Sequence, residues 1–317
     1  MAQIAYQEDD LRAPQPGNGP FLVIANRHSG TNARDGAALD RAMEVLAQGD
    51  ARLRHWDPKD DLRSLIAEEI AAGARTVVAA GGDGTVMAVA GALHGQQAAL
   101  AALPMGTFNY FTRGLGLPES PEEAARALLQ AERREIRIAT VNGQVFLNNA
   151  SLGIYPSILK EREDIYRRFG RRRLMAHWSV VRTFWRFQRP MRLVLEDPEG
   201  GTRRVRTPLL FVARSAYQLE RFNLGGRGAI HRDRLAVLIG CGQSRAALFR
   251  LAWRLVTRTM QEGRDYELVE AARIRVETAS HRPLLAYDGE KRRAAPPFDF
   301  AMSETPLDVL IPGERLS

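Results

Sequence analysis

An apolar, β-branched run at residues 75–80 leads directly into Gly81-Gly82-Asp83-Gly84-Thr85, and a second apolar run follows at residues 86–93. The first run predicts a buried strand and the second a buried helix. Three glycines at such a junction leave bare backbone N–H groups at the helix N-terminus, a place that favours phosphate. A tight turn that needs glycine for positive φ is the alternative. The stretch lacks the Gly-Lys-Ser/Thr of a P-loop, and Met87 replaces the third glycine of a dinucleotide fingerprint.

The rest of the N-terminal part alternates predicted strands and helices. Strands are predicted near residues 21–26, 52–56 and 98–103, and helices near residues 33–48 and 57–72. This alternation favours an α/β domain whose mostly parallel sheet is covered on both faces. Because ligands of such sheets bind at the carboxyl ends of the strands, we expect the turns at residues 26–32, 81–85 and 103–109 to share one edge.

The pattern changes after a helix predicted at residues 121–131. From Ile136 onward apolar residues alternate with period two, and Asn142-Gly143 predicts a hairpin turn. Strands are predicted at residues 136–141, 144–149, 191–196, 209–213, 234–239, 272–277, 283–287 and 306–311, and helices at residues 156–188 and 245–261. We therefore expect a loose leader at residues 1–19, an α/β domain at 20–135 and a mainly antiparallel β domain at 136–312. Alternatively, the last residues of the chain pack back on the α/β domain and not on the β domain.

Composition narrows the choice of partners and compartment. A chain of 317 residues with 45% hydrophobic and 26% charged residues is typical of a soluble two-domain protein. The net charge of +8 indicates an anionic partner. The single cysteine, Cys241, excludes an internal disulfide. The acidic start has no signal-peptide core, and no stretch approaches the about 20 apolar residues of a membrane span, so we expect a cytoplasmic protein.

Three motifs occur in order along the chain: residues 81–85, then Pro104-Met105-Gly106-Thr107-Phe108-Asn109, then Asp288-Gly289-Glu290. Together with residues 113–118 and 146–153 they resemble the bacterial diacylglycerol kinase family, which is related to sphingosine, ceramide and NAD kinases. The resemblance covers about residues 20–312. It implies an N-terminal three-layer α/β nucleotide domain, a C-terminal antiparallel β-sandwich and an active cleft between them. It also implies transfer of the γ-phosphoryl group of ATP to a lipid hydroxyl, with Mg²⁺ as cofactor.

The first two motifs are the nucleotide-binding part of this resemblance. The glycine motif would hold phosphate oxygens with backbone and hydroxyl donors, and Asp83 would act through Mg²⁺ or by holding the nucleotide. The resemblance implies a nucleotide-binding set made of Asn26, Ser29, Gly81, Gly82, Asp83, Gly84, Thr85, Gly106 and Thr107.

The third motif supplies the expected catalytic carboxylates. By resemblance, Glu290 is the general base that accepts the proton of the substrate hydroxyl, a contribution of about 10²–10⁴ in rate. Asp288 is a supporting carboxylate, and Asp83 completes the catalytic set. From spacing alone, residues 288–290 predict only a hairpin turn. A structural Mg²⁺ held by the Asp233 carboxylate and the Leu235 carbonyl is also implied, and an aspartate paired with arginine is the alternative.

Four residues depart from the family pattern. Met87 and Ala88 replace a polar pair in the helix after the glycine motif, Tyr110 replaces an aspartate or histidine, and Arg137 replaces an aspartate. These departures leave a second interpretation open. The chain would then be a catalytically weak or inactive sensor of the same fold that binds a nucleotide or a lipid.

Basic and aromatic residues cluster between Lys160 and Arg206. On a helix, Leu174, Trp178, Val181 and Trp185 would form one stripe with arginines beside it. Such a helix suits an anionic membrane surface, so we expect a lipid substrate reached peripherally on the inner face of the membrane. A helix that packs this stripe on the β domain is the alternative. No nucleic-acid partner is expected, because no nucleic-acid module is visible. The oligomeric state is left open, with a homodimer among the alternatives.

Overall fold

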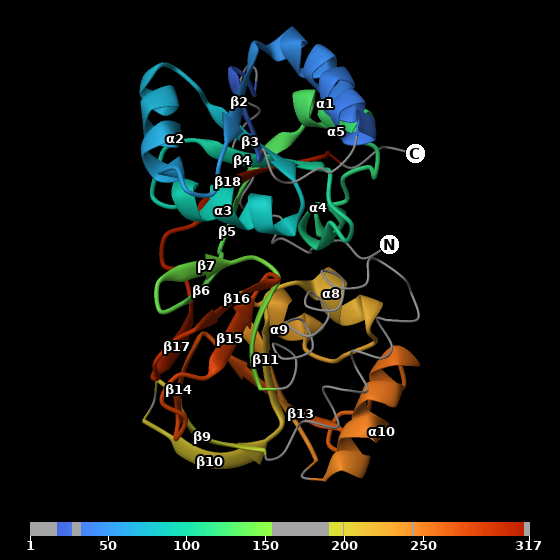
Figure 1. Ribbon diagram of the computed structural model, residues 1–317, viewed down its shortest axis with the longest axis vertical. Helices are drawn as coiled ribbons and strands as arrows, with labels where there is room; N and C mark the ends of the chain where they lie inside the picture. Colours follow the sequence, from blue (N-terminus) through green and yellow to red (C-terminus); the bar gives the residue numbers. More distant parts are fainter. Residues whose placement is uncertain (1–17, 27–32, 154–189, 199, 243, 314–317) are drawn as a thin grey trace. The chain divides into compact units, whose positions relative to one another are not determined.

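A computed structural model describes residues 18–26, 33–153, 190–198, 200–242 and 244–313 of the chain (Figure 1). The helix predicted at 156–188, most of the predicted leader and Ser29 lie outside the described residues. The chain divides into unit 1, residues 1–138 with 303–317, and unit 2, residues 139–302. None of the described helices is long and apolar enough to cross a membrane.

Unit 1 is built on a six-stranded sheet, called sheet A, in the strand order β2-β1-β3-β4-β18-β5. Its strands are β1 (Phe21–Asn26), β2 (Ala51–Trp56), β3 (Thr76–Gly81), β4 (Ala99–Pro104), β5 (Glu132–Ile136) and β18 (Leu307–Ile311). All neighbours are parallel except β18 and β5. Strands β3 and β4 are buried along their whole length, as expected for a sheet covered on both faces.

The helices of unit 1 cover the two faces of sheet A. They are α1 (Ala33–Leu46), α2 (Leu62–Ala71), α3 (Asp83–Leu93), α4 (Tyr110–Gly114) and α5 (Pro121–Leu129), with a short 3₁₀ turn, η2 (Ala47–Gly49), after α1. Helices α1 and α5 pack side by side, and so do α2 and α3 (Figure 1). Right-handed crossovers place α1 on one face and α2 with α3 on the other, because the chain reverses its direction across the sheet after β2.

Helix α2 begins later than the sequence predicts. It was expected to open at Asp57-Pro58, but residues 57–60 form a turn and the helix starts at Leu62. The physical reason is Asp61, whose carboxylate accepts hydrogen bonds from the backbone N–H groups of Arg63 and Ser64 at 3.1 and 3.2 Å. Asp61 is therefore the N-cap.

In its described residues, unit 2 has two six-stranded antiparallel sheets and three short helices. Sheet B has the order β10-β9-β14-β17-β6-β7, and sheet C has the order β13-β12-β11-β8-β15-β16. The strands are β6 (Ala139–Val141), β7 (Gln144–Phe146), β8 (Asn149–Gly153), β9 (Met191–Glu196), β10 (Thr202–Thr207), β11 (Leu209–Ala213), β12 (Leu235–Gly240), β13 (Tyr266–Ala271), β14 (Arg273–Thr278), β15 (Leu284–Tyr287), β16 (Glu290–Arg293) and β17 (Phe298–Met302). The helices are α8 (Ala216–Arg221), α9 (Arg227–His231) and α10 (Arg245–Val256). The expected fold class, a mostly parallel α/β domain followed by antiparallel β-sheets, is confirmed.

Two strands predicted as continuous are each divided in the structure. The predicted strand 136–141 separates into β5 of sheet A and β6 of sheet B. The predicted strand 144–149 separates into β7 of sheet B and β8 of sheet C, and the chain changes sheet at Leu147-Asn148. The hairpin predicted at Asn142-Gly143 is confirmed, since β6 and β7 pair directly across it with positive φ at both turn residues.

Candidate functional site

The glycine motif forms the junction between β3 and α3. Strand β3 ends at Gly81, Gly82 is the N-cap, and α3 begins at Asp83, three residues earlier than the sequence indicated. No side chain caps this helix, whereas Asp61, Ser120 and Ser244 cap α2, α5 and α10. The N–H groups of Thr85 and Val86 donate to the Gly82 carbonyl at 2.9 and 3.1 Å, and the positive end of the helix dipole lies at this junction with no side-chain cap over it.

The glycines of this junction are required by space and not by positive φ. Gly82 has φ −87° and ψ −177°, an extended conformation that any residue adopts. A Cβ on Gly106 would overlap the Cα of Gly82, and a Cβ on Gly82 would lie 3.2 Å from the Cα of Gly106. A Cβ on Gly81 would overlap the side chain of the buried Thr85. The positive-φ turn considered in the sequence is therefore not what the structure shows.

Asn109 holds the turn that follows β4. Its side-chain oxygen accepts a hydrogen bond from the N–H of Gly106 at 2.9 Å, and its amide donates to the Gly106 carbonyl at 3.0 Å. The side chain is buried and the backbone is left-handed, with φ 51°. Thr107 is exposed in the same turn. The sequence analysis included Asn109 in the second motif but predicted no role for it. An asparagine in a glycine-bearing turn is the feature that could have indicated this role.

Asp83 links the two turns. Its carboxylate lies in the first turn of α3 and accepts a hydrogen bond from the backbone N–H of Phe111, in α4, at 3.1 Å. A negative charge there is stabilised by the helix dipole. The N–H of Met105 donates to the Gly81 carbonyl at 3.1 Å, which joins the same two turns a second time.

The three predicted nucleotide turns follow neighbouring strands. Strand β3 lies between β1 and β4, and all three run parallel, so their carboxyl ends share one edge of sheet A. Asn26 ends β1 and is partly exposed. The structure thus places Asn26, Gly81–Thr85 and Gly106-Thr107 along that edge, which agrees with the topological rule for ligand sites.

The third motif is a tight hairpin in unit 2. Tyr287 pairs with Glu290, and Asp288 and Gly289 turn the chain with φ 45° and 91°. Burial raises the pKa of the Tyr287 hydroxyl, and the Arg292 guanidinium lies 5.3 Å from the ring centroid. Glu290 begins β16 and is exposed to solvent. The hairpin expected from spacing alone is therefore present, and it presents Glu290 outward.

Asp288 is buried and holds the crossover between the two sheets of unit 2. Its carboxylate accepts hydrogen bonds from the backbone N–H groups of Leu147 at 2.6 Å, Asn148 at 2.8 Å and Asn149 at 2.9 Å. Leu147 and Asn148 are the residues between β7 and β8, and Asn149 is the first residue of β8. Asp288 thus satisfies three backbone donors that sequence reasoning could not assign.

Asp233 makes an ion pair. The guanidinium of the buried Arg214 donates to its carboxylate at 2.9 Å, and Asp233 has φ 50°. This is the alternative that the sequence left open, and magnesium binding by Asp233 and Leu235 stays a prediction. Within the described residues, no group of three His, Cys, Asp or Glu side chains is arranged to hold a metal.

The residues that depart from the family pattern have structural surroundings of their own. Met87 is 7% exposed and packs in the core of unit 1. The Tyr110 ring stacks on Phe108, with centroids 5.5 Å apart and planes 2° from parallel. The Arg137 guanidinium donates to the Ser303 carbonyl at 3.1 Å. Core packing, stacking and a backbone contact thus occupy these positions.

Comparison with known proteins bears out the resemblance. Residues 20–141 match the family model of the diacylglycerol kinase catalytic domain. The chain is 50% identical over 135 residues to a protein named probable lipid kinase YegS-like from Pseudomonas aeruginosa (strain UCBPP-PA14). The matched residues make up 42% of this chain and 43% of that protein. A protein of the same name from Chromohalobacter salexigens is 41% identical over 140 residues, 43% of this chain and 44% of that protein. The chain thus matches less than half the length of these relatives.

The likeness in three dimensions extends further. The crystal structure of a diacylglycerol kinase from Bacillus anthracis str. Sterne superposes with a TM-score of 0.69 and covers 94% of this chain and 98% of that one. At 19% sequence identity, this likeness concerns the fold alone.

Proposed function

We propose that this chain is an ATP-dependent lipid kinase, since its residues 20–141 match the family model of the diacylglycerol kinase catalytic domain. It transfers the γ-phosphoryl group of ATP to the hydroxyl of diacylglycerol or a related lipid. The observation that carries the proposal is the close approach of Gly82 and Gly106 beside the uncapped N-terminus of α3. The turns at the carboxyl ends of β3 and β4 meet backbone to backbone with no side chain between them. They bring the N-terminus of α3, a place that favours phosphate, to the ligand edge of sheet A.

On the nucleotide side, the backbone N–H groups at the start of α3 hold the phosphates. Gly82 and Gly106 let the two turns meet, and Asn109 fixes the facing turn through its two hydrogen bonds to Gly106. Asp83 holds the geometry of both turns through Phe111. Asn26 and Thr107 face the same edge. Positioning and charge neutralisation are the main contributions that phosphoryl transfer needs from a protein.

Magnesium fits this edge only as an ion that arrives with the nucleotide. The described residues contain no three-ligand cluster, but Mg²⁺ commonly binds through one or two carboxylates together with phosphate oxygens and water. Asp83 is the carboxylate at the phosphate end of α3 and is the residue that would hold the ion. Bound there, Mg²⁺ neutralises charge that develops on the phosphate oxygens.

On the acceptor side, the exposed Glu290 accepts the proton of the lipid hydroxyl. The hydroxyl oxygen forms a bond to the γ-phosphorus, the bond from that phosphorus to the β-γ bridging oxygen breaks, and ADP leaves. Asp288 does not take part directly, because it holds three backbone amides and thereby the hairpin that carries Glu290. The lipid is reached peripherally at an anionic membrane on its cytoplasmic face.

The test is transfer of labelled phosphate from ATP, with Mg²⁺, to vesicles that contain diacylglycerol, sphingosine or ceramide. We expect labelled lipid with at least one of them, and none with a folded Asp83→Ala variant. Glu290→Gln should lower turnover about 10²-fold or more while ATP binding is kept. A folded protein that labels none of the lipids would contradict the proposal.

One observation favours the alternative of a catalytically weak sensor. Arg137 and Met87 stand where the family has acidic and polar residues, and the structure commits both to contacts of their own. A sensor would bind ATP tightly without turnover on any lipid alcohol. Calorimetric titration of ATP beside the vesicle assay separates the two functions.

A further inference from the structure

Helix α10 of unit 2 exposes an apolar stripe. Its inner face is anchored by Leu248, which is 3% exposed, but Phe249, Trp253 and Val256 are 38, 70 and 77% exposed. Positions i, i+4 and i+7 lie on one side of an α-helix. Three of the four large hydrophobic side chains exposed in the described part of the chain therefore gather on this one helix.

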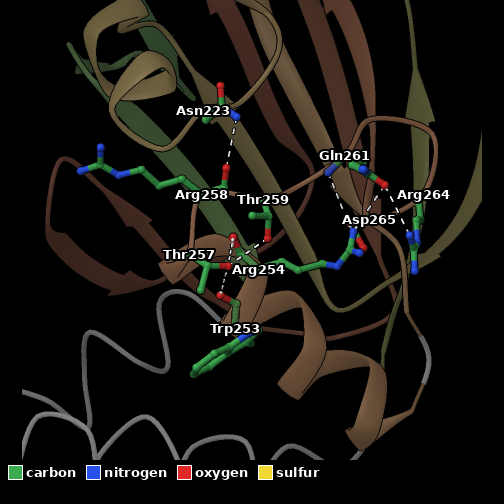
Figure 2. A network of polar contacts seen from close by, with 9 residues as sticks. All are labelled: Asn223, Trp253, Arg254, Thr257, Arg258, Thr259, Gln261, Arg264 and Asp265. Carbon is green, nitrogen blue, oxygen red and sulfur yellow. Dashed lines mark hydrogen bonds and ion pairs between the residues drawn. The ribbon is translucent and has the colours of Figure 1, made fainter.

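The helix is held so that the stripe faces outward. Arg254 donates to the carboxylate of Asp265 at 2.7 Å, and Asp265 is fully buried (Figure 2). The same carboxylate accepts from the N–H of Gln261 at 3.0 Å, and the N–H of Thr259 donates to the Arg254 carbonyl at 2.8 Å. In Figure 2 the Trp253 ring points away from this network. The anchoring contacts thus fix the rotation of the helix about its axis.

Helix α10 and the residues that flank it carry side-chain charges of one sign. Residues 240–261 contain Arg245, Arg250, Arg254 and Arg258 and no Asp or Glu. Arg254 is neutralised by Asp265, whereas Arg250 and Arg258 are exposed. An apolar stripe with tryptophan, bordered by arginines, combines the two attractions that an interfacial helix uses.

We propose that α10 docks on an anionic lipid bilayer. Phe249, Trp253 and Val256 enter the headgroup region, and Arg250 and Arg258 pair with anionic headgroups. The inference deepens the proposed function, since a lipid kinase must reach an acceptor in a bilayer, but the binding itself requires no catalysis.

Charge argues against two other occupants of the stripe. In a two-fold dimer the same patch meets itself, and the arginines of both copies would face each other with no acidic residue on α10 to pair with them. Residues 154–189 of this chain, which lie outside the described part, contain ten basic and three acidic residues and have the same sign as α10. An anionic surface has the complementary sign.

The test is cosedimentation of the full chain with vesicles of phosphatidylcholine alone or mixed with phosphatidylglycerol, without ATP. We expect binding to the mixed vesicles that weakens with added salt. Trp253→Ala should weaken it about tenfold, and Arg250→Gln about fivefold. Arg282→Gln is the matched control, because Arg282 is an exposed arginine between β14 and β15 of the same unit and lies outside the basic cluster at residues 160–206. It should bind as the parent does.

Other outcomes would overturn the proposal. Parent-like vesicle binding by both Trp253→Ala and Arg250→Gln would place the membrane contact elsewhere. A parent dimer that Trp253→Ala converts to a monomer, with vesicle binding unchanged, would assign the stripe to a second copy. Phosphorylation of a short-chain, water-soluble diacylglycerol separates the two proposals. If Trp253→Ala keeps that activity and loses vesicle binding, the kinase function and the docking of α10 are both supported. If the parent binds vesicles but phosphorylates no lipid, the docking proposal stands and the kinase function is wrong.

Discussion

Gly82 and Gly106 approach each other so closely that a single methyl group decides whether the two turns can meet. Gly106→Ala would place its Cβ against the Cα of Gly82, so the turn after β4 must move. We expect a loss of about 1–3 kcal/mol in the free energy of unfolding and at least tenfold weaker ATP binding. Urea unfolding and calorimetric titration measure the two effects. Gly36→Ala in α1 is the control, because no atom lies within 4 Å of its added Cβ; equal behaviour of both variants would contradict the steric argument.

Asp288 and Glu290 lie two residues apart and should fail in different ways. Asp288→Ala leaves three backbone N–H groups near Asn148 without their acceptor, and we expect a loss of about 3 kcal/mol or more in stability. Asp288→Asn tolerates the left-handed backbone and keeps one acceptor oxygen, but it removes the charge and replaces the other oxygen with an NH2 donor, so its loss should be smaller than that of Asp288→Ala. Glu290→Gln, on an exposed residue, should leave stability unchanged and affect turnover only. Hydrogen exchange of residues 144–153 reports the first effect, and unchanged exchange in Asp288→Ala would refute it.

At the scale of elements, the sequence pattern predicted those turns and junctions that are determined by interactions between residues close in sequence. The Asn142-Gly143 hairpin and the strand-to-helix junction at Gly81 were found, because turn chemistry and hydrophobic period act within a few residues. The division of residues 144–149 was missed, since the acceptor of its amides, Asp288, lies about 140 residues away in sequence. The start of α2 was misplaced because Asp57 and Asp61 are both possible caps. In the structure Asp57 accepts from the Lys59 N–H within the preceding turn, and Asp61 caps α2.

The stability of helix α10 should depend on pH in opposite directions in the parent and in an Arg254→Met variant. Burial alone would raise the pKa of Asp265, but the hydrogen bonds from Arg254 and the Gln261 N–H hold that pKa below its usual range. A carboxyl with a lowered folded-state pKa stabilises the protein above its ordinary pKa of about 3.9, and the contribution is lost as pH falls through the lowered value. In Arg254→Met the buried carboxyl loses its cation, so its pKa should rise. We expect this variant to be weakest at pH 7 and to recover toward pH 5.

Hydrogen exchange of residues 245–261 at pH 7 and pH 5, corrected for the intrinsic exchange rate, measures this response. Arg258→Met is the matched control, because Arg258 is exposed and contacts its neighbours through its backbone. Its N–H donates to the Leu255 carbonyl, and its carbonyl accepts from the Asn223 side chain (Figure 2). Arg258→Met should follow the parent at both values. If Arg254→Met did so too, the ion pair with Asp265 would not be what holds α10.

At the scale of the whole molecule, the C-terminal strand belongs to the N-terminal unit. Strand β18 lies between β4 and β5, and Val309 at its centre is fully buried. Val309→Asp would place a carboxylate in the core of unit 1, and we expect a loss of about 3–5 kcal/mol there. Asp308→Asn on the same strand is the control, because its side chain is partly exposed and pairs with Arg133 at 3.7 Å. The proposed nucleotide site lies at the carboxyl ends of β3 and β4, and β4 pairs with β18. ATP binding should therefore fall with Val309→Asp, although residue 309 follows all of unit 2 in the sequence. Hydrogen exchange should lose protection in β3 and β4 and keep it in β12; the opposite distribution would mean that the chain's end does not stabilise unit 1.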